Sequence, residues 1–410
     1  MPIKALLRAN THQGITMRSI PGSLFMLFVR KFLPWCDKQA VWFFVLFWFF
    51  FVSVGQNYGL TATCSQTHCP KGLFDSPLLF GGWVELGIYA DGDDNRDHGP
   101  FDAQNQRRND FQMNQLYLFG ERTMNTKRGF DWGARADIVY GTDAPGMQCY
   151  GDEDFDWATD EYGYGLAAYQ LFGTLGYKDL SVKIGKFGAP LGLETAASKD
   201  NFFYSYSNSY SIKPTTHTGI LTTYDLTRRL SLKAGWTTGE NSSFKSTQKS
   251  SSLLTGFVYE LPRDASLHYG FNSGTKKNVR DSYFVQSLCL EWKPVKRLTH
   301  VIQYDLRNTK DERGNMWFSA YGVNNHLRYR WNERWDSGLR FEWLRNNGDY
   351  VDKCSGDYYQ ITLGLNWRPY KHVSIKPEIR SDWFRGTGTP FARGTQRSRV
   401  TGGCGLVLSF

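Results

Sequence analysis

The stretch Val373–Phe384 reads V-S-I-K-P-E-I-R-S-D-W-F, and it decides the fold. Apolar side chains occupy alternate positions along most of it, and Ser, Lys, Glu, Arg and Asp stand between them. A period of two is typical of a β-strand with one dry face and one wet face. Such a strand fits either a sheet over a protein core or a barrel wall with lipid outside and water inside.

Neighbouring segments show the same alternation. Phe341 and Trp343 are separated by Glu342, and Ile361 to Trp367 repeats the pattern. Ionised groups cannot be buried singly in an apolar core, but they can line a water-filled lumen. Several tryptophans stand beside short connections, where an aromatic girdle at a membrane interface is expected: Trp292, Trp331, Trp335 and Trp367. A sandwich explains the alternation, but not this placement.

From residue 79 onward the pattern predicts about sixteen strands joined by short and long connections in strict alternation. An up-and-down barrel sorts its connections in this way, whereas Greek-key crossings in a sandwich do not. The sequence therefore predicts an all-β fold, a closed antiparallel transmembrane barrel. The strands are expected to begin near Leu79, Asp110, Phe130, Tyr164, Leu180, Thr215, Leu230, Ser250, Ala265, Ser282, Leu298, Trp317, Arg334, Asp357, Val373 and Arg399.

Closure follows from the solvent, because an open sheet edge in hydrocarbon leaves backbone donors and acceptors unpaired at several kcal/mol each. Pro377 lies inside an expected strand and has no N–H to give to a neighbour. We expect a bulge or a broken ladder at that position.

The N-terminal part has the layout of a signal peptide. Arg30, Lys31 and Lys38 precede the apolar run Val41–Val54, which is shorter than a spanning helix needs. We expect a targeting segment over 1–62, a short periplasmic segment over 63–78 and the barrel over 79–410. A single-pass signal anchor is the alternative. Removing 1–62 lowers the formal charge from +9 to +4, so the basicity does not indicate a nucleic-acid partner.

Six cysteines lie beyond the targeting segment, and their spacing is not of a metal-binding type. No disulfide is assigned. The final residues alternate and end in Phe410. This ending resembles the C-terminal signal of bacterial outer-membrane barrels, which the barrel assembly machinery reads.

Lys186–Ser207 reads K-F-G-A-P-L-G-L-E-T-A-A-S-K-D-N-F-F-Y-S-Y-S, and Thr216–Gly219 reads T-H-T-G. Together with N-Q-L-Y-L at Asn114–Leu118, these motifs resemble the putative β-barrel porin-2 (OmpL-like) family of bacterial outer-membrane proteins. The resemblance covers roughly residues 75–410. It implies a porin in the bacterial outer membrane.

A passive pore needs no catalyst and no cofactor, only a lumen whose width and charge decide what passes. The basic candidates for the pore lining are Arg135, Lys183, Lys233, Arg307, Arg328, Arg330, Arg340, Arg368, Lys376 and Arg380. The acidic candidates are Glu85, Asp137, Glu291, Asp305, Asp336, Glu342, Glu378 and Asp382. The numbers of basic and acidic candidates nearly balance, which predicts weak charge selectivity with a mild preference for anions. For any single position, a wall residue paired across strands is the competing interpretation.

The loop 188–214 is rich in Phe and Tyr without the alternation of a strand, so it is the predicted constriction. It either folds into the lumen or packs over the barrel mouth. Its candidate residues are Lys199, Asp200, Asn201, Phe202, Phe203, Tyr204 and Lys213. The loop Gly141–Gly163 is acidic, and we interpret it as a solvated loop rather than a divalent-cation site.

The sequence thus predicts an outer-membrane porin for passive diffusion of small hydrophilic solutes or ions, in contact with outer-membrane lipid. A plugged structural or adhesive barrel is the first alternative. A lipase-type enzyme in the barrel wall is the second, although no histidine lies in a recognisable nucleophile motif. Monomers and oligomers are both compatible with the pattern.

Overall fold

The chain divides into two units, Met1–Pro70 and Lys71–Phe410. The computed structural model describes residues 78–91, 101, 109–149, 156–157, 162–245, 249–277, 280–348, 354–392 and 394–410, all in the second unit. The predicted targeting segment, Cys64, Cys69 and most of the acidic residues of the loop 141–163 lie outside the described residues. No helix in the described part of the chain is long and apolar enough to span a membrane.

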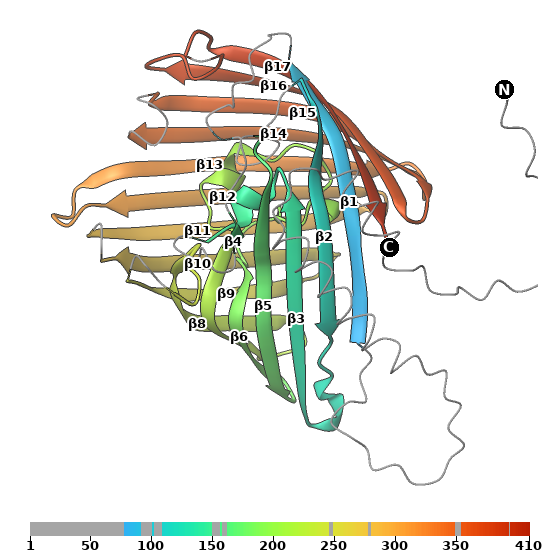
Figure 1. Ribbon diagram of the computed structural model, residues 1–410, viewed down its shortest axis with the longest axis vertical. Helices are drawn as coiled ribbons and strands as arrows, with labels where there is room; N and C mark the ends of the chain where they lie inside the picture. The colour runs from blue at the N-terminus through green and yellow to red at the C-terminus, as the bar shows by residue number, and fades with distance from the viewer. Residues whose placement is uncertain are drawn as a thin grey trace, which may run out of the picture. The chain divides into compact units, whose positions relative to one another are not determined.

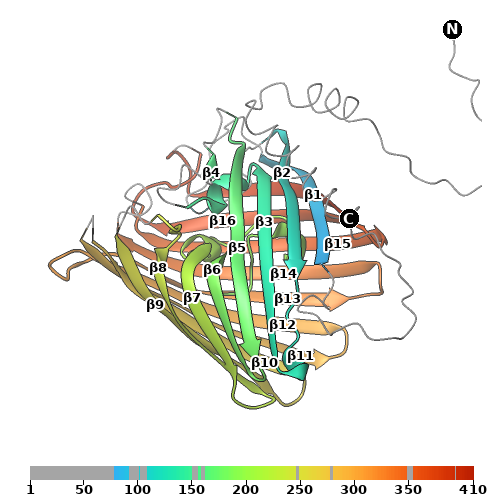
Figure 2. The same cartoon turned by 60° about the horizontal axis from the view of Figure 1, so that its bottom comes forward.

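Sixteen long strands in the described part form one antiparallel sheet that closes on itself (Figures 1 and 2). The closing pair is β1 with β17, in register from Trp83 opposite Ser409 to Asp91 opposite Thr401. Each long strand begins within one residue of its predicted start. They are β1 (Leu78–Asp91), β2 (Phe111–Arg122), β3 (Phe130–Gly141), β5 (Gly165–Tyr177), β6 (Leu180–Gly188), β7 (Thr216–Asp225), β8 (Leu230–Glu240), β9 (Ser250–Leu261), β10 (Ala265–Lys276), β11 (Asp281–Val295), β12 (Leu298–Lys310), β13 (Met316–Arg330), β14 (Trp335–Gly348), β15 (Gly356–Tyr370), β16 (Val373–Gly386) and β17 (Ser398–Ser409).

The short elements lie in the connections. The two-residue strand β4 (Asp156–Trp157) pairs with β5 and was not predicted. The helical turns are η1 (Thr126–Arg128), η2 (Ala144–Met147), η3 (Ser198–Asp200) and α3 (Asn208–Ser211). We call the end of the barrel that carries the connections 178–179, 226–229 and 331–334 the turn end. The opposite end, which carries the connections 189–215 and 387–397, is the loop end.

Strict alternation of short and long connections was wrong in detail. At the loop end, the connections 277–280 and 311–315 are short, and at the turn end 123–129 is longer than its neighbours. Both ends of the barrel sheet meet at the turn end, where Gly82 and Phe410 exchange backbone hydrogen bonds of 3.1 and 3.0 Å. These two bonds continue the closing ladder to the last residue of the chain.

Each strand presents two different faces. On β15 the outer face carries Ile361, Leu363 and Leu365, all exposed, whereas Gln360 and Thr362 on the inner face are fully buried. Buried polar groups must be hydrogen-bonded to be tolerated, and most of the inner-face groups are. The interior of the barrel is therefore polar, and its apolar surface faces outward, as in a barrel that spans a lipid bilayer.

Aromatic side chains form two belts on the outer face. Towards the turn end Trp335 stacks on Trp367, with ring centroids 5.3 Å apart. Towards the loop end Trp343 lies opposite Tyr359, which stacks on Trp383 at 5.4 Å. Such belts mark the two boundaries of the hydrocarbon layer.

Pro377 breaks the ladder, as predicted. The pairing of β15 with β16 runs to Gly364 opposite Glu378 and resumes at Trp367 opposite Ile375 in the same register, which leaves Leu365 and Asn366 unpaired with β16. No bulge forms at the proline itself. The register shift occurs later, between Trp367 and Tyr370.

Replacing Pro377 by valine is expected to stabilise the barrel by on the order of 1 kcal/mol, because the new N–H can pair across the gap to β15. The measurement is the temperature at which the folded form is lost in detergent, followed by heat-modifiable migration on gels. Ile375→Val, on the same face without a new donor, is the control. An unchanged or lower temperature for Pro377→Val would contradict this account of the gap.

Candidate functional site

The loop between β6 and β7, residues 189–215, lies inside the ring of strands rather than over its mouth (Figures 1 and 2). It carries η3 and α3, and most of its aromatic side chains are buried, among them Phe203, Tyr204, Tyr206 and Tyr210. Its hydrogen bonds reach β2, β12 to β14 and β16, and Leu191 also packs against Tyr283 and Val285 of β11. We call this segment the inner loop.

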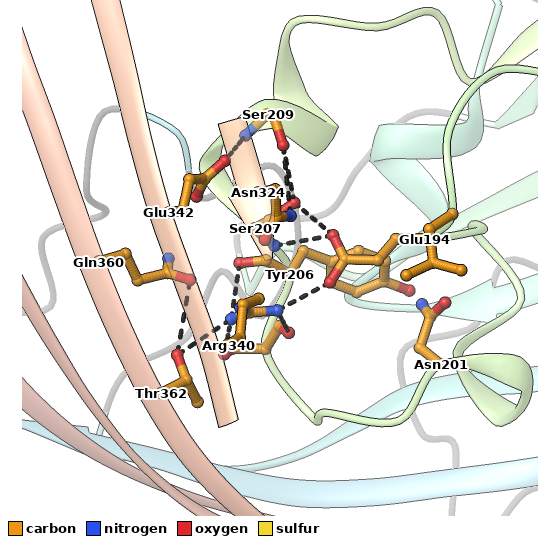
Figure 3. A network of polar contacts seen from close by, with 12 residues as sticks. Glu194, Asn201, Tyr206, Ser207, Ser209, Asn324, Arg340, Glu342, Gln360 and Thr362 are labelled. Carbon is orange, nitrogen blue, oxygen red and sulfur yellow. Dashed lines mark hydrogen bonds and ion pairs between the residues drawn. The ribbon is translucent and has the colours of Figure 1, made fainter. Parts of the chain in front are cut away.

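Two glutamates of the wall bind backbone N–H groups of the inner loop. Glu378 on β16 accepts from Tyr204 N at 2.9 Å and from Ser205 N at 3.2 Å. Glu342 on β14 accepts from Asn208 N at 2.7 Å and Ser209 N at 2.6 Å (Figure 3). The second pair belongs to the first turn of α3, whose N–H groups have no partner within the helix. Each carboxylate thus fixes two consecutive residues of the loop.

Cationic side chains bind the carbonyl groups of the same loop. Arg340 donates to Glu194 Oε1 at 2.7 Å and to Ser205 O at 2.8 Å (Figure 3). Arg380 donates to Tyr206 O at 2.9 Å and is also bound by Asp382. Hydrogen bonds with a charged partner are about twice as strong as neutral ones, so alternating signs on the wall hold the loop by both backbone groups.

Lys376 holds the middle of the inner loop, and residues of β12 hold it near both ends. Lys376 Nζ donates to Ser198 O at 2.8 Å and Asn201 O at 2.7 Å. On β12, Gln303 accepts from Leu193 N at 2.7 Å, and Arg307 donates to Ile212 O at 3.3 Å. The loop is therefore bound along most of its length.

Glycines in the wall make room for the aromatic side chains of the loop. A Cβ at Gly338 would lie 2.3 Å from the Phe202 ring, and one at Gly364 would lie 2.9 Å from Phe203. Tyr204 lies against Gly405 in the same way. These strands therefore carry glycine where a side chain would displace the loop.

The tyrosines of the inner loop stay neutral. Burial, followed by nearby carboxylates, raises the pKa of Tyr204 and Tyr206 well above its usual value. The Tyr204 hydroxyl donates to Asn114 Oδ1 at 3.0 Å, and Tyr206 donates to Ala196 O at 3.3 Å. Both hydroxyls act as structural donors.

The predicted pore-lining residues fall into three groups. Those under the inner loop are bound to it, and they do not border open space: Arg340, Glu342, Lys376, Glu378, Arg380, Asp305 and Arg307. At the turn end Arg330 and Arg368 both pair with Asp336. The third group, on the part of the inner wall away from most of these contacts, comprises Arg135, Asp137, Lys183, Lys233 and Arg328.

The predicted constriction residues divide by exposure. Asn201, Phe203, Tyr204 and Lys213 are buried, and Phe202 is half-buried on Gly338. Lys199 and Asp200 are exposed, as are Gly192 and Thr195, which were not predicted. Lys199 nevertheless lies beside the wall, with its Nζ 5.5 Å from the centre of the Trp83 ring on β1.

Residues missing from the prediction complete the site. Glu194 is the buried ion-pair partner of Arg340, and Gln115 donates to Ala196 O at 2.8 Å. The sequence gives a hint of Gln115, because Asn114 and Gln115 are two consecutive polar residues where the strand should alternate. It gives none of Glu194, because a lone glutamate in a loop does not reveal its partner.

An opening remains beside the inner loop. A cavity of about 160 Å³ lies between Pro190 and Gly192 of the loop and the wall of β7 to β11, including Lys233 and His268. On the neighbouring wall Arg135 pairs with Asp137 and Glu121, both at 2.8 Å. The border of this cavity combines apolar residues such as Leu221 and Leu254 with Lys233 and Thr255.

Comparison with known structures agrees with this geometry. OmpT of Vibrio cholerae, in its trimer form, has 10% sequence identity and a TM-score of 0.55, covering 82% of this chain and 99% of its own. The anion-selective porin from Comamonas acidovorans has 10% sequence identity and a TM-score of 0.55. The match covers 82% of this chain and 100% of that porin. The outer membrane channel DcaP of Acinetobacter baumannii has 12% sequence identity and a TM-score of 0.54. The match covers 85% of this chain and 100% of DcaP. At such identities the similarity establishes the fold alone.

No curated protein sequence matches the chain. The model of the putative β-barrel porin-2, OmpL-like family matches residues 77–410, which span the whole described barrel. The chain therefore belongs to the putative β-barrel porin-2, OmpL-like family, and it is a porin-type barrel of the bacterial outer membrane.

Proposed function

We propose that the protein is a diffusion channel for small hydrophilic solutes, with a cross-section that the inner loop reduces. The observation that carries this proposal is the attachment of the loop to one side of the wall. Glu342, Arg340 and Glu378 bind it to β14 and β16, whereas Lys183 and Lys233 on β6 and β8 keep part of their surface exposed. A sixteen-strand barrel is wide enough to leave an aqueous passage beside such a loop.

In this proposal the charged residues have two roles. Those under the loop anchor it, and those opposite it border the passage. The exposed Lys199 and Asp200 form the loop side of the constriction. No chemistry beyond solvation is required of any of them, so the proposal assigns no catalytic residue.

The test is planar-bilayer recording of the purified protein in salt solution. A pore gives discrete current steps that grow in proportion to voltage, and liposomes that contain it swell in small sugars. Heat-denatured protein is the control. Silence from the folded protein would contradict the proposal and favour the plugged structural or adhesive barrel, which has the same loop.

The proposed partners follow from the outer surface. Outer-membrane lipid covers the apolar belt, and the trimer form of OmpT makes an oligomer a natural proposal here. The backbone of Phe410 is paired with Gly82 while its side chain is 65% exposed. An exposed terminal ring is suited to recognition by the barrel assembly machinery.

A further inference from the structure

Three cations on the inner wall lack an acidic partner. They are Lys183 on β6, Lys233 on β8 and Arg328 on β13, and we call them the cationic arc. Among the described residues, no carboxylate oxygen lies within 4.0 Å of their charged nitrogens. All three side chains are half-buried, so they are neither fully screened by water nor neutralised by the protein.

Most carboxylates of the wall beneath the inner loop are, by contrast, occupied, although Glu85 Oε1 is buried without a hydrogen-bond partner among the described residues. Glu342 and Glu378 accept backbone N–H groups, and Glu194 is paired with Arg340. Asp137 accepts from Arg135 at 2.8 Å and from Gln170 at 2.6 Å. Glu240 pairs with Lys276 at 2.7 Å and with Arg307. On the wall, the cations of the cationic arc therefore lack an acidic partner among the described residues, whereas on the loop itself the exposed Lys199 and Asp200 carry opposite signs.

One member of the cationic arc lines the cavity beside the inner loop, and the other two lie at a distance from it. Lys233 lines the cavity beside Pro190 and Gly192 of the inner loop, and Lys183 lies two strands away, on the order of 10 Å. The guanidinium of Arg328 lies 5.7 Å from the Phe202 ring at the edge of the loop. Its Nε is buried and has no hydrogen-bond partner among the described residues.

Aromatic rings keep these cations in place without neutralising them. Lys183 Nζ lies 4.3 Å from the centre of the Phe172 ring, and Arg328 lies near Phe202. A ring face attracts a cation through its quadrupole but carries no net charge. The field of each cation therefore still acts on a passing ion.

Asp225 and Glu260 lie closer to the turn end than Lys233, whereas Glu291 is level with His326 and lies further from that end than Arg328. Asp225 and Glu260 stand near the turn-side ends of β7 and β9. Asp225 is two residues from Thr223, which is opposite Lys233. Asp225 and Glu260 therefore stand away from the section that the inner loop narrows, and salt screens their charges more effectively than charges in that section.

From this arrangement we infer that the channel selects small anions, which pass along the cationic arc and are bound beside Lys183 and Lys233. The inference rests on the proposed channel function and adds the substrate class. Chloride, carboxylates and inorganic phosphate share the chemistry that three unpaired cations recognise. Cations of similar size are repelled from the same section.

The test compares reversal potentials of single channels in a KCl gradient at low salt. The native protein is expected to pass chloride in preference to potassium. The triple variant Lys183→Gln, Lys233→Gln, Arg328→Gln should lose the preference, since one charge at about 5 Å in water changes a local ion concentration roughly fourfold. Millimolar inorganic phosphate should reduce the chloride current of the native channel, and not that of the variant.

A matched control removes three positive charges elsewhere, through Lys178→Gln, Lys296→Gln and Arg313→Gln at exposed turn and loop positions. This variant should keep the anion preference. Heat-modifiable migration on gels establishes that both variants are folded. A non-selective or cation-selective native channel, or a triple variant with an unchanged preference, would overturn the inference and leave the proposed channel intact. Complete silence of the native protein would instead remove the channel itself.

Discussion

Replacing Arg340 by methionine is expected to detach the inner loop and produce larger, noisier single-channel currents. Arg340 is fully buried and holds Glu194, Ser205 O and Ser205 Oγ at 2.7 to 2.9 Å. Methionine fills much of the same volume but leaves the Glu194 carboxylate buried without its cation. Breaking a buried pair in this way costs about 3–5 kcal/mol, which is comparable with what holds a loop segment in place.

The measurement is the distribution of current levels in planar bilayers, together with the rate at which protease cuts the loop. Arg280→Met removes an arginine from the exposed pair with Glu312, where both side chains are largely in solvent. Exposed pairs contribute about 0–1 kcal/mol, so this control should behave as the native protein. If Arg340→Met has the same current levels and the same resistance to protease as the native protein, the loop is held by its aromatic contacts alone.

Replacing Leu363 by arginine is expected to impair insertion and folding of the barrel. Leu363 lies on the outer face of β15, 55% exposed, four residues from Tyr359 in one belt and four from Trp367 in the other. This position is the middle of the hydrocarbon layer. Arginine there costs about 2–4 kcal/mol in a transmembrane barrel.

Folding into lipid vesicles, followed by the heat-modifiable gel shift, measures this effect. Leu226→Arg is the matched control, because Leu226 is similarly exposed at 50% but lies in a connection at the turn end. The control should fold as well as the native chain. Equal folding of both variants would mean that the face carrying Leu363 does not meet lipid.

Local pattern was enough to predict the wall of the barrel. A two-residue period such as that of Ile361 to Trp367 identifies both the strand and its two faces, because each side chain must choose between lipid and the interior. Turn-forming residues also indicate where strands end, as Pro262 and Asp264 do between β9 and β10. The strand β4 was missed because two residues are too few to show a period.

The contacts of the inner loop could not be predicted from local sequence pattern. Its aromatic content predicted that it would be buried, but Arg340 and Glu342 looked like pore-lining residues because sequence alternation reports only that they face inward. Whether an inward side chain meets water or another segment depends on contacts between residues more than a hundred positions apart, such as Glu194 with Arg340. For the same reason, counting charges predicted weak selectivity, whereas the pairing of those charges leaves Lys183, Lys233 and Arg328 uncompensated.

The spacing of the aromatic belts has a consequence for the membrane this barrel suits. Eight residues separate Trp335 from Trp343 on β14, and eight separate Tyr359 from Trp367 on β15. At about 3.4 Å per residue this is roughly 27 Å along the strand, and about 20 Å along the bilayer normal at the usual tilt of such strands. A protein with so short an apolar height matches a thin bilayer. In thicker membranes lipid tails must compress around it, and that mismatch favours its retention in the outer membrane over the inner one.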